Sequence, residues 1–93
     1  MDFFVKNLKE TLDAINKLIE KNISITSTKR VRRCNNIKSS NRSKINFIWR
    51  SLELLQEKGI LELNGSSSPK KYHIIPDQKI DIEKFISEIK KER

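Results

Sequence analysis

Basic side chains are concentrated in one third of this sequence. Residues 21–50 contain nine Lys or Arg and no Asp or Glu, whereas the rest of the chain carries 11 basic and 12 acidic residues. Guanidinium and ammonium groups bind phosphate and carboxylate oxygens, and cations clustered without acidic neighbours are typical of surfaces that meet an anionic partner. The net charge of +8 therefore belongs to one segment. The chemistry that this segment favours is the binding of phosphate groups.

Residue sets for catalysis or metal binding are not found in the sequence. A single cysteine, Cys34, excludes an internal disulfide, and one histidine, His73, leaves too few ligands for a usual zinc site. Nucleophile–base pairs, glycine-rich phosphate loops and paired carboxylates in an apolar setting are also missing. We expect no enzymatic activity, no cofactor, no metal and no small-molecule ligand. Cys34 is expected to be a buried apolar side chain and His73 to be structural.

Length and composition indicate one folded domain over residues 1–93. A chain of 11.0 kDa closes a single hydrophobic core, and its 35% hydrophobic residues occur in periodic clusters. No apolar run approaches the roughly 18 residues that a membrane-spanning helix needs, and the first residues do not resemble a signal peptide. We expect a soluble, cytoplasmic protein without membrane contact.

The first third of the chain predicts a helix, a short strand and a second helix. Apolar residues at steps of three and four indicate an amphipathic helix over residues 2–21. Residues 22–26 then alternate between apolar and polar, which favours an extended segment. Thr26 or Ser27 is suited to cap a short helix that runs to about Cys34. We expect Asn35 and Asn36 to end this helix, because Asn tolerates turn and left-handed conformations.

A longer helix is predicted over residues 41–58, with Ser39 or Ser40 as its cap and Gly59 beyond its end. Trp49 lies at the flank of its apolar stripe, and we expect its large ring to pack in the core. Phe47 is expected either to tuck against another element or to meet a partner. The apolar stripe consists of Ile45, Ile48, Leu52 and Leu55, and the opposite face carries Ser43, Asn46, Phe47, Arg50 and Leu54.

The last third of the chain predicts a β-hairpin and a final helix. Residues 60–63 and 70–75 are strand-like and flank a turn-rich loop. Asp81 is suited to cap a helix over residues 81–92, whose apolar positions follow helical spacing. This helix and the first one expose more apolar surface than the remaining core needs. They are expected to pack together within one chain or to form a homodimer interface, and the homodimer is the favoured alternative.

The predicted order of elements resembles the winged helix-turn-helix family, in which two helices joined by a tight turn precede a β-hairpin. The resemblance covers residues 23–75, and its most specific part is SKINFIWRSLELLQEKGI, from Ser43 to Ile60. Ile23 to Ile25 are similar to the first short strand of the family, and Lys70 to Ile75 to the returning strand of the wing. The resemblance implies a mainly α fold of the α+β class, in the order α-β-α-α-β-β-α.

The resemblance also implies how such a domain meets double-stranded DNA. The second helix of the motif enters the major groove, where Arg binds guanine and Asn binds adenine through two hydrogen bonds each. The preceding helix crosses the phosphate backbone, and the wing contacts a neighbouring phosphate or the minor groove. The expected DNA-binding residues are Lys29, Arg30, Arg32, Arg33, Lys38, Asn41, Arg42, Ser43, Lys44, Asn46, Arg50, Lys70 and Lys71.

The function expected from these features is sequence-preferring binding of double-stranded DNA, as by a small transcriptional regulator. Alternatives remain open. The basic face could dock an acidic protein, as an adaptor or accessory subunit of a nucleic-acid machine, or it could bind DNA without sequence preference as an architectural protein. RNA binding is less favoured, because the sequence lacks paired exposed aromatic residues.

Overall fold

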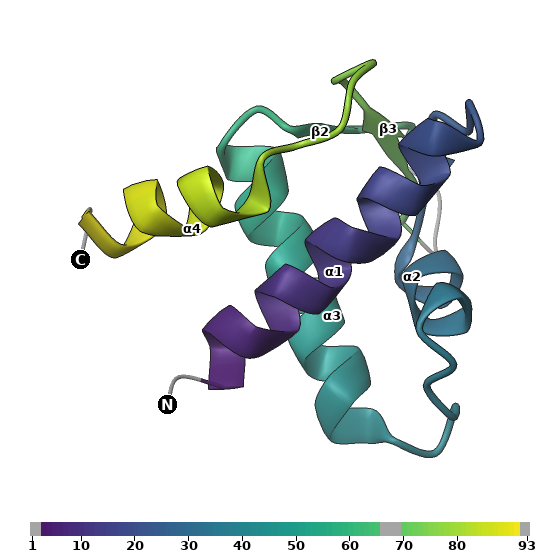
Figure 1. The fold of residues 1–93 in the computed structure, drawn as a ribbon. Coiled ribbons are helices and arrows are strands. Elements are labelled where there is room, and N and C mark those ends of the chain that lie inside the picture. Colours follow the sequence, from purple (N-terminus) through teal and green to yellow (C-terminus); the bar gives the residue numbers. More distant parts are fainter. Residues whose placement is uncertain (1–2, 66–69, 92–93) are drawn as a thin grey trace.

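The computed structural model describes residues 3–65 and 70–91. Within them, four helices and a small antiparallel sheet follow each other in the predicted order, and the α+β class is confirmed. In Figure 1, α1 crosses in front of α3, with α2 on one side and α4 on the other. The elements are α1 (Phe3–Glu20), β1 (Ile25–Thr26), α2 (Thr28–Cys34), α3 (Arg42–Glu57), β2 (Leu61–Leu63), β3 (Tyr72–Ile74) and α4 (Ile82–Lys91).

The core is built around α1, half of whose residues are buried. Its apolar side chains at steps of three and four form a wide stripe, which packs against α2, α3 and α4. Val31 is the buried residue of α2. Of the predicted stripe of α3, Ile48, Leu52 and Leu55 are buried, whereas Ile45 is only half-buried. Because the short α2 buries so little, Lys29, Arg30 and Arg33 are left exposed at the surface.

Three helices end in the same way. Asn22, Asn36 and Gly59 follow α1, α2 and α3 with positive φ angles of 61°, 54° and 79°. After each of them, the next N–H bonds back to a carbonyl in the last helical turn, as Ile23 does to Leu18 at 2.9 Å. In this C-cap, the residue after the left-handed position is usually apolar and packs on the helix. Here those residues are Ile23, Ile37 and Ile60, which are partly buried against the core.

The first strand is shorter than predicted because the cap of α1 takes up Ile23, so β1 begins at Ile25. The sheet order is β1-β3-β2, and both pairings are antiparallel. In β3, Tyr72 and Ile74 are buried, whereas His73 between them is exposed on the other face. His73 therefore takes no part in the core.

The final helix packs against α1 within one chain. Its Ile86 and Ile89 are buried, and the Lys9 ammonium lies 3.6 Å from the Glu83 carboxylate. Asp81 caps the helix as predicted, since its side chain accepts a hydrogen bond from the Lys84 N–H at 3.2 Å. The apolar stripe that the homodimer alternative required is thus used inside the chain. Among the described helices, none combines the length and the apolar character needed to cross a membrane.

Candidate nucleic-acid interface

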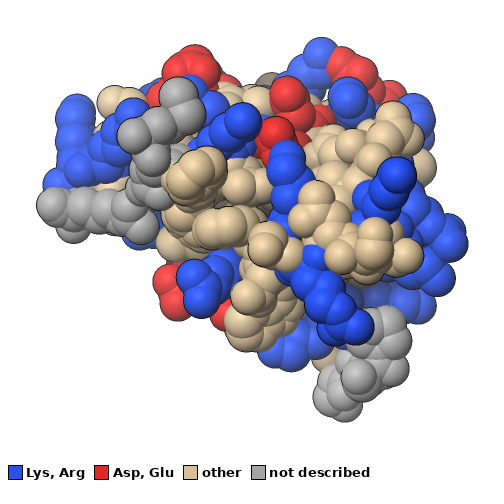
Figure 2. Space-filling view, turned by 90° about the horizontal axis from the view of Figure 1, so that it is seen from below, with Lys and Arg blue, Asp and Glu red and all other residues tan. Residues whose placement is uncertain are grey.

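Many cations of the predicted basic segment are exposed. Figure 2 shows Lys and Arg side chains along the right-hand side, where α2 lies in Figure 1, and others at the left, with acidic side chains at the upper edge and the lower left. None of the exposed cations of this basic face forms an ion pair with another described residue, so all are open to an anionic partner. They are Lys29, Arg30, Arg33, Lys38, Arg42 and Arg50.

The outward side of α3 carries the side chains expected to contact bases. Ser43, Asn46, Phe47 and Arg50 recur at steps of three, one and three, which places them on one face of the helix. They line one shallow depression of about 130 Å³. Ser43, Asn46 and Arg50 are exposed, whereas Phe47 is half-buried and forms the apolar part of this depression. Phe47 therefore belongs to the outer face rather than to the buried core.

The cap of α3 differs from the prediction. Neither Ser39 nor Ser40 caps the helix, because the Asn41 side-chain oxygen accepts a hydrogen bond from the Lys44 N–H at 3.3 Å. A capping oxygen satisfies one of the free N–H groups of the first turn. Asn41 thus fixes where α3 begins, and its side-chain oxygen is not free to contact DNA while it serves as the cap.

Two of the predicted DNA-binding cations are held by the protein itself. The Arg32 Nη1 donates a hydrogen bond to the Ile37 carbonyl at 3.0 Å, so this guanidinium braces the turn between α2 and α3. The Lys44 ammonium lies 3.1 Å from Glu10 Oε2 and thereby joins α3 to α1. Both side chains are half-buried. Each of these two side chains therefore has a partner within the chain, and their contact with DNA stays a prediction.

The prediction that Trp49 packs in the core is also wrong, because 41% of its surface is exposed. Trp49 shares a flank of α3 with Arg42, seven residues earlier, and with Glu53, four residues later. Charged residues at these spacings are the sequence signal that the flank faces solvent. An exposed ring beside basic side chains adds an aromatic contact surface to this part of the molecule.

The hairpin of β2 and β3 carries two of the predicted DNA-binding residues. Lys70 and Lys71 are exposed just before β3, which is shorter than the strand predicted over residues 70–75, so both are accessible to a partner. The Asn64 N–H bonds to the Lys71 carbonyl at 2.8 Å, which extends the β2–β3 pairing toward the tip. The predicted loop tip falls on residues 66–69, which lie outside the described residues.

Cys34 is half-buried rather than buried, and it lines a cleft between α1 and α2. The sequence did not indicate this cleft, because the residues on its two sides are far apart in the chain. The described residues contain no group of three His, Cys, Asp or Glu side chains placed to hold a metal ion. Comparisons with family models, curated proteins and solved structures found no match.

Proposed function

We propose that this protein binds double-stranded DNA in the manner of a winged helix, with the first half of α3 in the major groove. The observation that carries the proposal is the shared face of Ser43, Asn46 and Arg50, which is exposed, basic and free of acidic side chains. Arg and Asn are the side chains that read guanine and adenine edges by paired hydrogen bonds. The order of the elements and the sheet of β1, β3 and β2 support the winged-helix assignment.

The exposed cations of α2 and the following turn would supply sequence-independent affinity. Lys29, Arg33 and Lys38 are free of ion pairs within the described residues and would meet phosphates beside the groove. Each neutralised phosphate releases counterions, so affinity falls with salt. With six such contacts, the logarithm of the association constant is expected to fall with the logarithm of salt concentration at a slope of roughly −5.

The test is a titration of labelled duplexes, one of random sequence and one AT-rich, at about 50 and 200 mM salt. Fluorescence anisotropy reports binding, and emission from Trp49, the single tryptophan, reports contact near α3. We expect tight binding at low salt and a change in Trp49 emission. Absence of duplex binding at low salt would contradict the proposal. Steep salt dependence without any sequence preference would instead indicate an architectural protein.

Substitution of Arg50 tests directly whether α3 reads bases. Arg50→Ala is expected to cost about 1 to 3 kcal/mol at a preferred site, and Arg50→Lys should retain affinity for random duplex while losing most of the preference. The matched control is Lys90→Ala, which removes an exposed cation from α4. If Arg50→Ala and Lys90→Ala weaken every duplex equally, α3 does not read bases.

A second candidate function is the docking of an acidic protein, and the exposed Trp49 favours it. Tryptophan and arginine are enriched at the energetic centres of protein interfaces. This adaptor function would combine the Trp49 ring with the basic face and would show no duplex binding. It predicts that an acidic helical peptide binds, and that Trp49→Ala weakens this binding more than Lys38→Ala does.

A further inference from the structure

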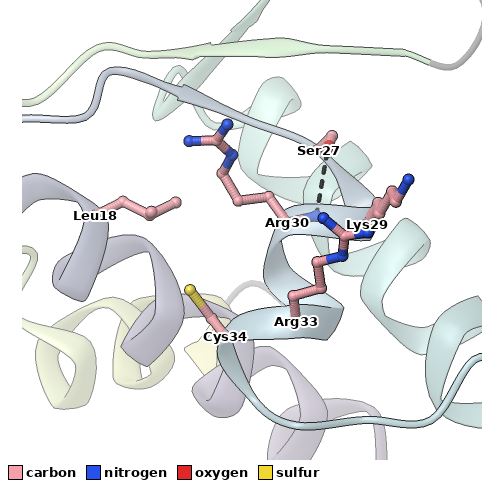
Figure 3. Close-up of a pocket in the computed structure, with 6 residues that line it drawn as sticks. All are labelled: Leu18, Ser27, Lys29, Arg30, Arg33 and Cys34. Atoms are coloured by element: carbon pink, nitrogen blue, oxygen red, sulfur yellow. Dashed lines mark hydrogen bonds between the residues drawn. The ribbon is translucent and has the colours of Figure 1, made fainter.

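A second basic site lies between α1 and α2. It is a cleft of about 440 Å³, within the size range of small-molecule sites. Figure 3 shows the side chains of Leu18, Cys34 and Arg30 converging on one opening, with Lys29 and Arg33 on the other side of α2. The described lining residues are Leu18, Ser27, Lys29, Arg30, Arg33 and Cys34.

The floor of the cleft is apolar. Leu18 is 3% exposed and belongs to the core, while the half-buried Cys34 packs against the same core from α2. Ser27 shapes the entrance, because its hydroxyl oxygen accepts a hydrogen bond from the Arg30 N–H at 3.2 Å. This contact fixes the first turn of α2 and with it the positions of the basic residues that follow. An apolar floor favours a ligand with an apolar body.

The rim of the cleft is cationic. Arg30, Arg33 and Lys29 line it, no described acidic residue does, and none of the three forms an ion pair within the described part of the chain. Cations held close together repel one another, and an anion placed between them relieves that repulsion. Arginine in particular binds carboxylate, sulfonate and phosphate oxygens through two parallel hydrogen bonds.

The cleft is separate from the outer face of α3. The depression on α3 is lined by Ser43, Asn46, Phe47 and Arg50, and the two sets of described lining residues have no member in common. A DNA phosphate is fully hydrophilic and gains nothing from the Leu18 and Cys34 floor. The cleft therefore has a feature that the proposed DNA contact does not use.

We propose that this cleft binds a small amphiphilic organic anion, with its carboxylate, sulfonate or phosphate group at Arg30 and its apolar body over Leu18 and Cys34, while Arg33 and Lys29 add positive charge from the other side of α2. The site goes beyond the proposed function and does not depend on it. Because Arg30 and Arg33 also belong to the basic face, an occupied cleft would lower the positive charge presented to a second anion.

The test uses 8-anilinonaphthalene-1-sulfonate as the probe, with fluorescence as the readout and the intact chain as the protein. We expect one binding site per chain, displacement by decanoate, and no displacement by inorganic phosphate at the same concentration. Arg30→Ala should weaken probe binding about fivefold, and Arg33→Ala should weaken it less, because Arg33 lies on the other side of α2. Lys90→Ala, a cation on α4, is the matched control and should leave probe binding unchanged. Circular dichroism and cooperative urea unfolding check that each variant is folded.

Three outcomes would overturn the proposal. Displacement by inorganic phosphate as effective as that by decanoate would show a simple cation cluster. Probe binding that survives in the Arg30→Ala, Arg33→Ala double variant would place the probe elsewhere. Binding to vesicles of anionic lipid, without binding of the soluble probe, would show a membrane contact instead. A further variant, Arg50→Ala, keeps this test distinct from that of DNA binding, because it should alter duplex binding and leave probe binding unaffected.

Discussion

The Lys44 ammonium lies 3.1 Å from Glu10 Oε2 and 3.3 Å from Glu10 Oε1, and this contact ties the first turn of α3 to α1. The backbone of Glu10 has a second role, because its carbonyl accepts a hydrogen bond from the Asn35 side chain at 3.1 Å. One residue of α1 thus holds both the end of α2 and the start of α3. These contacts connect the two helices of the basic face through α1.

The Glu10–Lys44 pair gives a prediction about DNA affinity. Glu10→Gln removes a carboxylate and frees the ammonium, so duplex binding at low salt should become severalfold tighter. The Glu10→Gln, Lys44→Gln double variant keeps the net charge of the pair and should bind duplex within about twofold of the original protein. Fluorescence anisotropy measures both. A double variant that binds duplex severalfold more weakly than the original protein would show that Lys44 contacts DNA directly. Because both side chains are partly exposed, unfolding free energy should change by less than about 1 kcal/mol.

Arg32 is predicted to act on stability. Arg32→Ala removes the hydrogen bond to the Ile37 carbonyl and leaves that carbonyl with one partner fewer at the turn between α2 and α3. We expect a loss of about 1 kcal/mol in the free energy of unfolding, measured by urea denaturation. Arg33→Ala removes the same charge from an exposed neighbour and serves as the control, with a smaller expected loss. Equal losses for the two variants would show that the turn does not depend on Arg32.

Asn16 is predicted to hold the segment that leads into α4. Its Nδ2 donates a hydrogen bond to the Ile80 carbonyl at 3.0 Å, and its Oδ1 accepts one from the Ile80 N–H at 2.7 Å. Asn16→Asp cannot donate and places a carboxylate against the carbonyl. We expect a loss of about 1 to 3 kcal/mol in the free energy of unfolding. Hydrogen exchange in α4 should rise relative to α3, and unchanged exchange would contradict this role.

Tyr72 is predicted to lower the free energy of unfolding as the pH becomes alkaline. Its ring is 1% exposed, and its hydroxyl has no hydrogen-bond partner among the described residues. Burial raises the pKa of Tyr72 above the ordinary value, and the nearby Glu53 carboxylate raises it further. The unfolded chain therefore loses this proton at a lower pH than the folded chain, starting near about pH 10. Above that pH the folded state binds more protons, so stability falls as pH rises.

Tyr72→Phe isolates this effect, because every other ionisable group is the same in both proteins. The original protein should lose stability more steeply than the variant above about pH 10, as measured by urea denaturation. Since Tyr72 is the single tyrosine, the ultraviolet absorbance of tyrosinate follows its titration directly. Removing an unpaired buried hydroxyl should also leave stability at neutral pH unchanged or slightly higher. Titration at the ordinary pKa would contradict the burial argument.

Much of the fold could be predicted from local sequence. Asn36 and Gly59 end their helices as expected, because a left-handed residue followed by an isoleucine is a short-range signal. The buried stripe of α3 follows from the spacing of its apolar residues. The same spacing places Asn46 and Arg50, the candidates for base contact, on the exposed face of α3 opposite the stripe. Each of these features depends on residues within one or two helical turns.

Other features depended on contacts between distant segments. The stripe of α4 alone left packing within the chain and a homodimer open, with the homodimer favoured, and only the folded chain shows that α4 packs against α1 and that Ile86 is buried. Lys44 and Arg32 read as free cations, because their partners, Glu10 and the Ile37 carbonyl, are visible only in the folded chain. The exposure of Trp49 could have been read from Arg42 and Glu53 on the same flank.

The sequence by itself determined the spacing of apolar residues in the helices, the residues that end the helices, and the segment that carries the positive charge. Each of these is set by neighbours along the chain. The tertiary structure decided which cations stay free and where an apolar floor meets a cationic rim. Leu18 and Arg30 line one cleft although the α1 cap and β1 lie between them in the chain. Such a contact is fixed by the packing of α2 on α1, whose geometry is set by the core of the whole chain and not by local spacing.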